Sequence, residues 1–212
     1  MNAFICIGGD ILREGIWERP EEGDLVIAAD SGYRNAVLLG IAPTLVVGDF
    51  DSMPEDEIPS HIEKLTVPAE KDFTDAQLAV DIAMKKGCRR ITIVGGLGGR
   101  LDHTLSCLGI LENVNKAGGF AIITDGKNRV RYLRGTSELI PRSDFRYFSL
   151  IAVDPVVKGV TIEGGKYHLK NATIRRENQF AVSNEVDGNC ALVTVRKGGL
   201  FLVESKDMLT QK

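Results

Sequence analysis

The chain lacks the features that would place it in a membrane or bring it to nucleic acid. None of its apolar runs approaches the roughly 20 residues that a membrane helix needs. The short run Ala3–Ile7 has neither the length nor the basic flank of a signal peptide. The 26 Lys and Arg residues are outnumbered by 29 Asp and Glu, for a net charge of -3, so there is no basic surplus to attract a polyanion. We therefore expect a cytoplasmic protein with no membrane or nucleic-acid partner.

Cysteine pairs and nucleophile motifs are missing as well. The 4 cysteines are scattered through 212 residues with no C-x-x-C pair, a pattern typical of a reduced protein without a zinc site. None of the 3 histidines has a metal-ligand spacing or lies in a nucleophile elbow. The sequence therefore favours chemistry that depends on positioning and charge neutralisation, as phosphoryl-type transfer does.

The apolar pattern changes character near residue 126. Up to that point short apolar runs alternate with amphipathic stretches, which is typical of βαβ units around a parallel sheet. Beyond it only short alternating runs remain, separated by turn residues, as in an antiparallel sandwich or barrel. We predict an α/β nucleotide-binding catalytic domain with a mainly parallel sheet over residues 1–126. An all-β domain over residues 127–212 follows it.

Individual elements can be assigned from the same pattern. In the first domain we expect strands at Ala3–Ile7, Leu25–Ala29, Leu45–Val47, Lys64–Val67, Ile91–Val94 and Ala121–Thr124. We expect helices at Asp75–Lys86, with Thr74 and Gln77 forming a capping box, and at Asp102–Lys116. In the second domain we expect strands at Val130–Leu133, Phe148–Val153, Val160–Ile162, Ala172–Arg175, Ala191–Val195 and Leu200–Glu204, with Gly198 and Gly199 as a turn between the last two.

Acidic residues follow four consecutive predicted strands. They are Asp30 after the second strand, Asp49 and Asp51 after the third, Asp72 and Asp75 after the fourth, and Asp102 after the fifth. The carboxyl ends of parallel strands meet at one edge of a sheet, where ligands bind. Clustered carboxylates repel one another unless a cation neutralises them, and Mg²⁺ with substrate phosphates suits such hard oxygen ligands. Asp49 and Asp51, two residues apart, can share this metal.

A glycine-rich turn follows the fifth predicted strand. Gly95–Gly99 and then Arg100 stand at the entrance of a helix. Bare backbone amides, a helix N-terminus and a guanidinium group together suit a phosphate. The turn is not a Walker A loop, since no Gly-Lys-Ser or Gly-Lys-Thr follows it. It predicts a phosphate site beside the acidic cluster.

Taken together, the motifs resemble the thiamine pyrophosphokinase family. The matching segments, in chain order, are Ala29–Gly32, Gly40–Ser52, Lys71–Asp75, Gly95–His103 and Ser183–Glu185. The resemblance implies transfer of a pyrophosphoryl group from ATP to the hydroxyethyl oxygen of thiamine, with Mg²⁺ as cofactor and thiamine diphosphate and AMP as products. It also implies a homodimer whose active site lies between the subunits, with the β domain contributing thiamine contacts and the dimer interface.

The resemblance also implies a role for each matched residue. Asp49, Asp51 and Asp75 would hold the metal; Asp30, Asn35, Lys71, Thr74, Gly98, Gly99 and Arg100 would contact the nucleotide and its phosphates; and Ser183 and Asn184 would bind thiamine. Asp72 or Asp102 would accept the proton of the thiamine hydroxyl, and the residues do not decide between them. Phe180 and Phe201 are candidates for an aromatic contact with thiamine, and each suits a core position equally.

Two other functions stay open at this stage. A strand followed by Asp49 and Asp51 resembles the haloacid dehalogenase pattern, in which Asp49 would be the covalent nucleophile of a Mg²⁺-dependent phosphatase. That motif usually follows the first strand, whereas here it follows the third. A non-catalytic nucleotide sensor would use the glycine-rich turn but would leave the convergent carboxylates unexplained. Consumption of ATP with AMP as product distinguishes the kinase from both.

Overall fold

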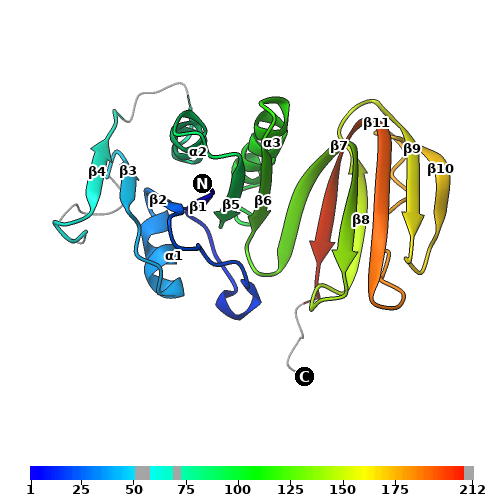
Figure 1. The fold of residues 1–212 in the computed structure, drawn as a ribbon, viewed down its shortest axis with the longest axis horizontal. Helices are drawn as coiled ribbons and strands as arrows, with labels where there is room; N and C mark the ends of the chain where they lie inside the picture. Colours follow the sequence, from blue (N-terminus) through cyan, green and yellow to red (C-terminus); the bar gives the residue numbers. More distant parts are fainter. Residues whose placement is uncertain (51–57, 69–72, 208–212) are drawn as a thin grey trace. The chain divides into compact units, whose positions relative to one another are not determined.

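The computed structural model describes residues 1–50, 58–68 and 73–207, and its fold is an α/β fold dominated by strands (Figure 1). The chain divides into two compact units, Met1–Gly126 and Lys127–Lys212. Over the described ranges, no helix is long and apolar enough to cross a membrane.

The first unit is built on a parallel sheet. Its strands are β1 (Ala3–Cys6), β2 (Leu25–Ala29), β3 (Leu45–Gly48), β4 (Glu63–Thr66), β5 (Arg90–Val94) and β6 (Phe120–Thr124). Their order in the sheet is β6-β5-β1-β2-β3-β4, and every neighbouring pair is parallel. The chain therefore runs outward from β1 to one edge and then returns to build the other side from β5. The strands predicted from the apolar runs of this unit are confirmed to within one residue at either end.

Helices cover both faces of this sheet. They are α1 (Gly32–Leu39), α2 (Asp75–Lys85) and α3 (Leu101–Lys116), together with the short 3₁₀ turn η1 (Arg13–Gly15). Figure 1 shows α2 and α3 on one side of the sheet and α1 on the other. The helix α1 was not predicted. Its eight residues bury Asn35 and expose Val37 and Leu38, so its apolar period is poorly marked.

The predicted cap of α2 is confirmed in part. Thr74 Oγ1 accepts a hydrogen bond of 3.2 Å from the backbone N–H of Gln77. The Gln77 side chain donates through Nε2 to Asp81 Oδ1, one turn further along the helix, at 2.7 Å.

The second unit is antiparallel. Its strands are β7 (Asn128–Pro141), β8 (Tyr147–Ala152), β9 (Val156–Glu163), β10 (Leu169–Arg175) and β11 (Cys190–Ser205). The order is β10-β9-β11-β7, and β8 pairs with β11. The first half of β11 pairs with β9 and its second half with β8, while β7 pairs with both halves. These strands enclose a core that includes Leu133, Phe148, Leu150, Val193 and Leu202.

The turn predicted at Gly198 and Gly199 is wrong. Residues 190–205 form the single strand β11, whose pairing with β7 shifts register between Val195 and Gly199. Gly198 has a φ of 88°, which a glycine adopts without strain. The two glycines therefore make an irregularity within one long strand, and the ladder resumes on its far side.

A buried network of charges joins β7 and β11. Glu204 is 1% exposed and accepts hydrogen bonds from Arg131, which is 7% exposed. Arg129 also donates to both oxygens of Glu204, at 3.0 and 2.9 Å. Arg131 donates further to Glu138 Oε1 at 2.5 Å. Glu204 is thus the shared acceptor for two guanidinium groups that are largely buried.

We predict that Glu204→Ala lowers the free energy of unfolding by about 3–5 kcal/mol, because it removes the buried carboxylate that Arg129 and Arg131 share. Urea denaturation followed by far-UV circular dichroism measures the change. The control is Asp154→Ala, which removes the partner of the 43% exposed Arg134 and should cost about 1 kcal/mol or less. Equal small losses in both variants would show that the network is not a stabilising feature.

Candidate active site

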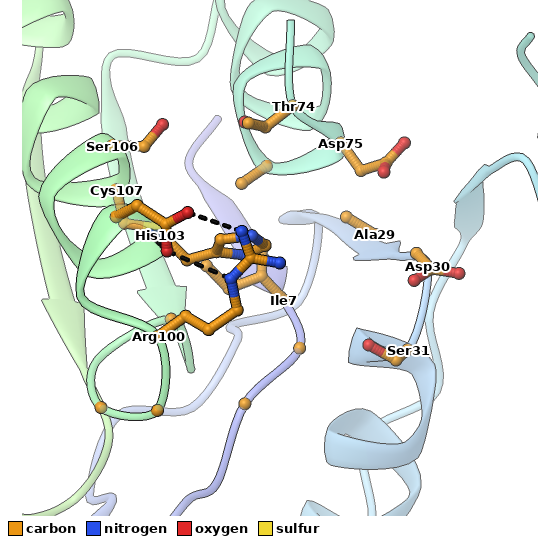
Figure 2. Close-up of a pocket in the computed structure, with 17 residues that line it drawn as sticks. Ile7, Ala29, Asp30, Ser31, Thr74, Asp75, Arg100, His103, Ser106 and Cys107 are labelled. Atoms are coloured by element: carbon orange, nitrogen blue, oxygen red, sulfur yellow. Dashed lines mark hydrogen bonds and ion pairs between the residues drawn. The ribbon is translucent and has the colours of Figure 1, made fainter. Parts of the chain in front are cut away.

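A pocket of about 640 Å³ opens at the carboxyl edge of the parallel sheet (Figure 2). Its lining comes from the segments after β1, β2 and β5, from the first turn of α2 and from the first two turns of α3. The lining comprises Ile7–Gly9, Ala29–Ser31, Thr74–Ala76, Gly96, Gly98–Arg100, Asp102, His103, Ser106 and Cys107. The strand order reverses between β1 and β5, and open α/β sheets bind their ligands at such a point.

The segments around the pocket approach one another backbone to backbone. An ideal Cβ at Gly32 would lie 2.2 Å from the carbonyl oxygen of Cys6, and one at Gly95 would lie 2.4 Å from that of Ile7. The backbone N–H of Gly96 donates to Gly8 O at 2.9 Å. Glycine is required where the chain leaves β1, β2 and β5 because no side chain fits between these segments.

Asn35 lies behind the pocket and is not among the residues that line it. Its amide is buried and donates to the carbonyl oxygens of Ile7 at 2.8 Å and of Gly9 at 2.9 Å. The structure therefore does not bring Asn35 to the position of a direct nucleotide contact. Its side chain instead fixes the segment after β1, and that segment forms one wall of the pocket.

Asp30 and Asp75 bring carboxylates to the pocket. Asp30 directly follows β2 and has a φ of 47°, a left-handed conformation that few non-glycine residues adopt. Asp75 is the first residue of α2, next to the capping Thr74. In Figure 2 these two carboxylates lie on one side of the pocket and Arg100 lies on the other. Backbone conformations such as that of Asp30 gather at functional sites, where surrounding contacts maintain them.

The predicted metal ligand Asp49 is close to Asp30 but is not part of the pocket lining. It is half-buried and follows Gly48, whose ideal Cβ would lie 3.3 Å from Asp30 Cα. The next residue, Phe50, has a φ of 60° and is buried in the core on the α1 side of the sheet. The other predicted site residues of this region, Asp51, Lys71 and Asp72, lie outside the described residues.

Arg100 and Asp102 form an ion pair at the pocket. Arg100 Nε donates to Asp102 Oδ1 at 3.2 Å and Nη2 donates to Oδ2 at 2.6 Å, while the backbone N–H of His103 donates to Oδ1 at 3.0 Å. The Arg100 hydrogen bond is the main cause that lowers the pKa of Asp102 to about 2. A carboxylate held in its ionised form this firmly is a weak proton acceptor.

The donor set of the pocket fits a magnesium ion bound together with phosphates. Carboxylate oxygens are the ligands that Mg²⁺ prefers, and it usually takes one or two of them and completes its shell with water and substrate. Asp30 and Asp75 supply that number. In the part of the chain that the structure describes, no group of three or more His, Cys, Asp or Glu side chains could form a cage of protein ligands.

Several pocket residues carry no strong sequence signal. Gly8 and Gly9 follow the first strand and line the pocket, and inspecting the residues after every strand would have found them. Thr104 was missed as a support of the glycine-rich turn: it is not part of the lining, and its Oγ1 accepts a hydrogen bond of 3.2 Å from the backbone N–H of Gly98. Gly98 and Gly99 themselves line the pocket as predicted, with φ of 97° and 69°.

The residues predicted to bind thiamine belong to the second unit. Ser183 is exposed and has a φ of 56°. Asn184 is buried, and its side chain accepts from the backbone N–H of Tyr167 and of Glu185 and donates to Tyr167 O, at 2.9, 2.9 and 2.7 Å. Asn184 therefore ties two loops together, and Ser183 is the accessible member of the pair.

The two aromatic candidates differ in their surroundings. Phe180 is 48% exposed. Phe201 is half-buried on β11 and packs edge to face against Tyr132, with ring centroids 5.8 Å apart. Of the two, Phe180 presents the larger apolar surface to solvent, whereas Phe201 is partly covered by Tyr132.

Fold and pocket together define an α/β protein whose candidate active site lies at the switch point of a parallel sheet. The family model described as thiamin pyrophosphokinase, catalytic domain, matches residues 17–123, and the model of the vitamin B1 binding domain of the same enzyme matches residues 136–200. The thiamine pyrophosphokinase of Bacillus subtilis is 32% identical over 193 residues, which cover 88% of this chain and 90% of the relative. The chain belongs to the thiamine pyrophosphokinase family.

Solved structures agree over the full chain. The crystal structure of thiamine pyrophosphokinase from Bacillus subtilis has a TM-score of 0.88 at 28% identity and covers 98% of this chain and 100% of its own. That of the enzyme from Geobacillus thermodenitrificans has a TM-score of 0.84 at 27% identity, with 99% of each chain covered. The family resemblance drawn from the motifs is confirmed. The comparisons support neither the haloacid dehalogenase-like phosphatase nor the nucleotide sensor.

We predict that iodoacetamide at pH 8 modifies Cys190 before the other cysteines. Cys190 is exposed, whereas burial raises the pKa of the Cys107 thiol in the pocket and raises that of Cys6 to about 12. A thiol with a raised pKa stays protonated at this pH, and only the thiolate reacts. Peptide mapping by mass spectrometry measures the order, with the urea-unfolded chain as control. Early modification of Cys107 would show that the pocket is more open than its geometry indicates.

Proposed function

We propose that this protein transfers a pyrophosphoryl group from ATP to the hydroxyethyl oxygen of thiamine, giving thiamine diphosphate and AMP. The observation that carries the proposal is the family match along both units. The pocket at the sheet edge supports it, since it combines carboxylates for a cation with a guanidinium group for phosphate.

We assign different tasks to the two units. Residues 1–126 form the nucleotide-binding catalytic domain, because the pocket and the match to the catalytic-domain model both fall there. Residues 127–212 contribute the thiamine contacts and the dimer interface. The match to a vitamin B1 binding domain over residues 136–200 and the exposed Ser183 support the first of these tasks. The homodimer and the cytoplasmic location stay predictions from the sequence.

The polyphosphate of ATP is expected at the glycine-rich turn. Arg100 stands just before α3, so a bound phosphate would meet both its guanidinium and the positive end of the helix dipole. The N-terminus of α2, at Thr74 and Asp75, faces the same pocket. Positive groups and carboxylates around one pocket suit a ligand that consists of phosphates and a cation.

The carboxylates would hold Mg²⁺ against those phosphates. Asp75 and Asp30 are the described candidates at the pocket, and Asp49 and Asp51 are the candidates from the segment after β3. When bound, the cation neutralises charge on the phosphates during the transfer. The protein's own part is to fix the carboxylate oxygens so that no large rearrangement is needed when ATP arrives.

The reaction itself is an in-line displacement at the β-phosphorus. The thiamine hydroxyl oxygen forms the new O–P bond, the bond from the β-phosphorus to the α-phosphate oxygen breaks, and AMP departs with that oxygen. The hydroxyl proton must pass to a base. Because the Arg100 hydrogen bonds hold Asp102 in its ionised form, Asp72 is the better candidate for this task.

The test of the function is an assay with purified protein, thiamine, ATP and Mg²⁺. Chromatography should find thiamine diphosphate and AMP in equal amounts, and EDTA should abolish both. Formation of ADP, or release of free phosphate without thiamine diphosphate, would contradict pyrophosphoryl transfer.

We predict that Asp75→Asn lowers kcat by about 10²–10³-fold, because the pocket loses a fixed charge that stabilises the transition state. The matched control is Asp81→Asn on the same helix, which lies away from the pocket lining and should retain normal turnover. Steady-state kinetics on both variants provide the comparison. A near-normal kcat for Asp75→Asn would remove this residue from the metal and phosphate site.

A further inference from the structure

The ion pair of Arg100 with Asp102 is not explained by stability. The two side chains are 73% and 63% exposed. Ion pairs in such surroundings contribute about 0–1 kcal/mol, since water screens the attraction and both side chains lose rotational freedom. The pair is nevertheless bidentate, with both carboxylate oxygens engaged. Its main consequence is therefore the direction that it imposes on the guanidinium group.

Asp102 is the fixed member of the pair. It is the second residue of α3, and its Oδ1 also accepts from the backbone N–H of His103. A carboxylate in the first turn of a helix is favoured by the helix dipole. Arg100, by contrast, stands before the helix at the end of a turn with two positive-φ glycines, Gly98 and Gly99. Without a partner its long side chain would sample many rotamers.

The ion pair leaves the phosphate-binding edge of Arg100 available. A guanidinium group has five N–H donors, and Asp102 takes one from Nε and one from Nη2. Both donors of Nη1 and the second donor of Nη2 are not used by Asp102. Figure 2 shows the guanidinium group of Arg100 facing the interior of the pocket. That edge can bind a phosphate through two parallel hydrogen bonds.

The first turn of α3 also holds the backbone of the same loop. Thr104 Oγ1 lies 3.2 Å from the backbone nitrogen of Gly98, whose N–H donates to it, and 3.3 Å from the carbonyl oxygen of Gly98. Thr104 thus fixes the path of the loop, while Asp102 fixes the side chain at its end. Both contacts come from one rigid element, so the arrangement is set before a ligand arrives.

We propose that Asp102 is a positioning residue that directs the outer edge of Arg100 toward the polyphosphate of the nucleotide, and that it serves neither as proton acceptor nor as metal ligand. The inference rests on the proposed function for the identity of the nucleotide. This role separates Asp102 from Asp30 and Asp75, which lie across the pocket from Arg100.

The test is a double-mutant cycle on nucleotide binding. The probe is α,β-methylene-ATP with Mg²⁺, titrated by calorimetry into the wild type, Asp102→Ala, Arg100→Ala and the double variant. Asp102→Ala should weaken binding about 10-fold, the lower end of the effect of supporting residues on their ligands. In the Arg100→Ala background the same change should have no further effect, because nothing remains to be oriented. Equal losses in both backgrounds would overturn the proposal.

Kinetics of Asp102→Asn provide a second readout. The loss should fall on KM for ATP more than on kcat, and the acidic limb of the kcat profile against pH should keep its midpoint. The Mg²⁺ concentration for half-maximal rate should also stay unchanged. Loss of the acidic limb would identify Asp102 as the proton acceptor, and a raised Mg²⁺ requirement would identify it as a metal ligand, so either result contradicts the proposal.

The matched control is Glu112→Gln, which breaks the 2.9 Å pair with Lys116 on the same helix and should leave binding and kinetics unchanged. Thermal melts by circular dichroism verify that each variant is folded. If the wild type binds the probe but makes no thiamine diphosphate, the proposed function fails while the binding cycle still tests Asp102. If the wild type does not bind the probe, the role of Asp102 is overturned as well.

Discussion

Direct backbone contact between the segments that leave β1, β2 and β5 is the constraint on which the pocket depends. At Gly32 and Gly95 even a methyl group would collide with a carbonyl oxygen at the end of β1, that of Cys6 or of Ile7. Asn35 holds that segment from behind through Ile7 and Gly9. Because these three segments are so close, side chains carried on separate strand ends reach one cavity at the point where the strand order reverses.

The carboxylates of Asp30 and Asp75 and the guanidinium group of Arg100 lie on different sides of the pocket. Asp30, after the end of β2, and Asp75, at the start of α2, present carboxylates to the pocket. Arg100 faces them from the start of α3. The site is therefore matched to a ligand that carries both signs, as a magnesium polyphosphate does. Asp102 has a different position in this arrangement, since it belongs to the cationic side and engages the guanidinium group there.

Much of the fold and part of the site could be predicted from the sequence. Strands of the parallel sheet, the helices α2 and α3 and the cap at Thr74 follow from periodicity and from residue types that neighbour one another in the chain. Seven predicted site residues do line one pocket: Asp30, Thr74, Asp75, Gly98, Gly99, Arg100 and Asp102. These residues could be predicted from their positions after the strands, because a parallel sheet brings the carboxyl ends of its strands to one edge whatever the details of packing.

The sequence by itself thus determined the strand-end motifs and pointed to the family and its reaction, since each motif depends on residues that are close together in the chain. Only the tertiary structure decided which groups pair. It showed that Asn35 binds the backbone after β1, that Asn184 ties two loops together and that Asp102 engages Arg100. It also joined residues 190–205 into one strand across Gly198. The physical reason is that a hydrogen bond is selected by distance and direction in space, and residue type alone specifies neither.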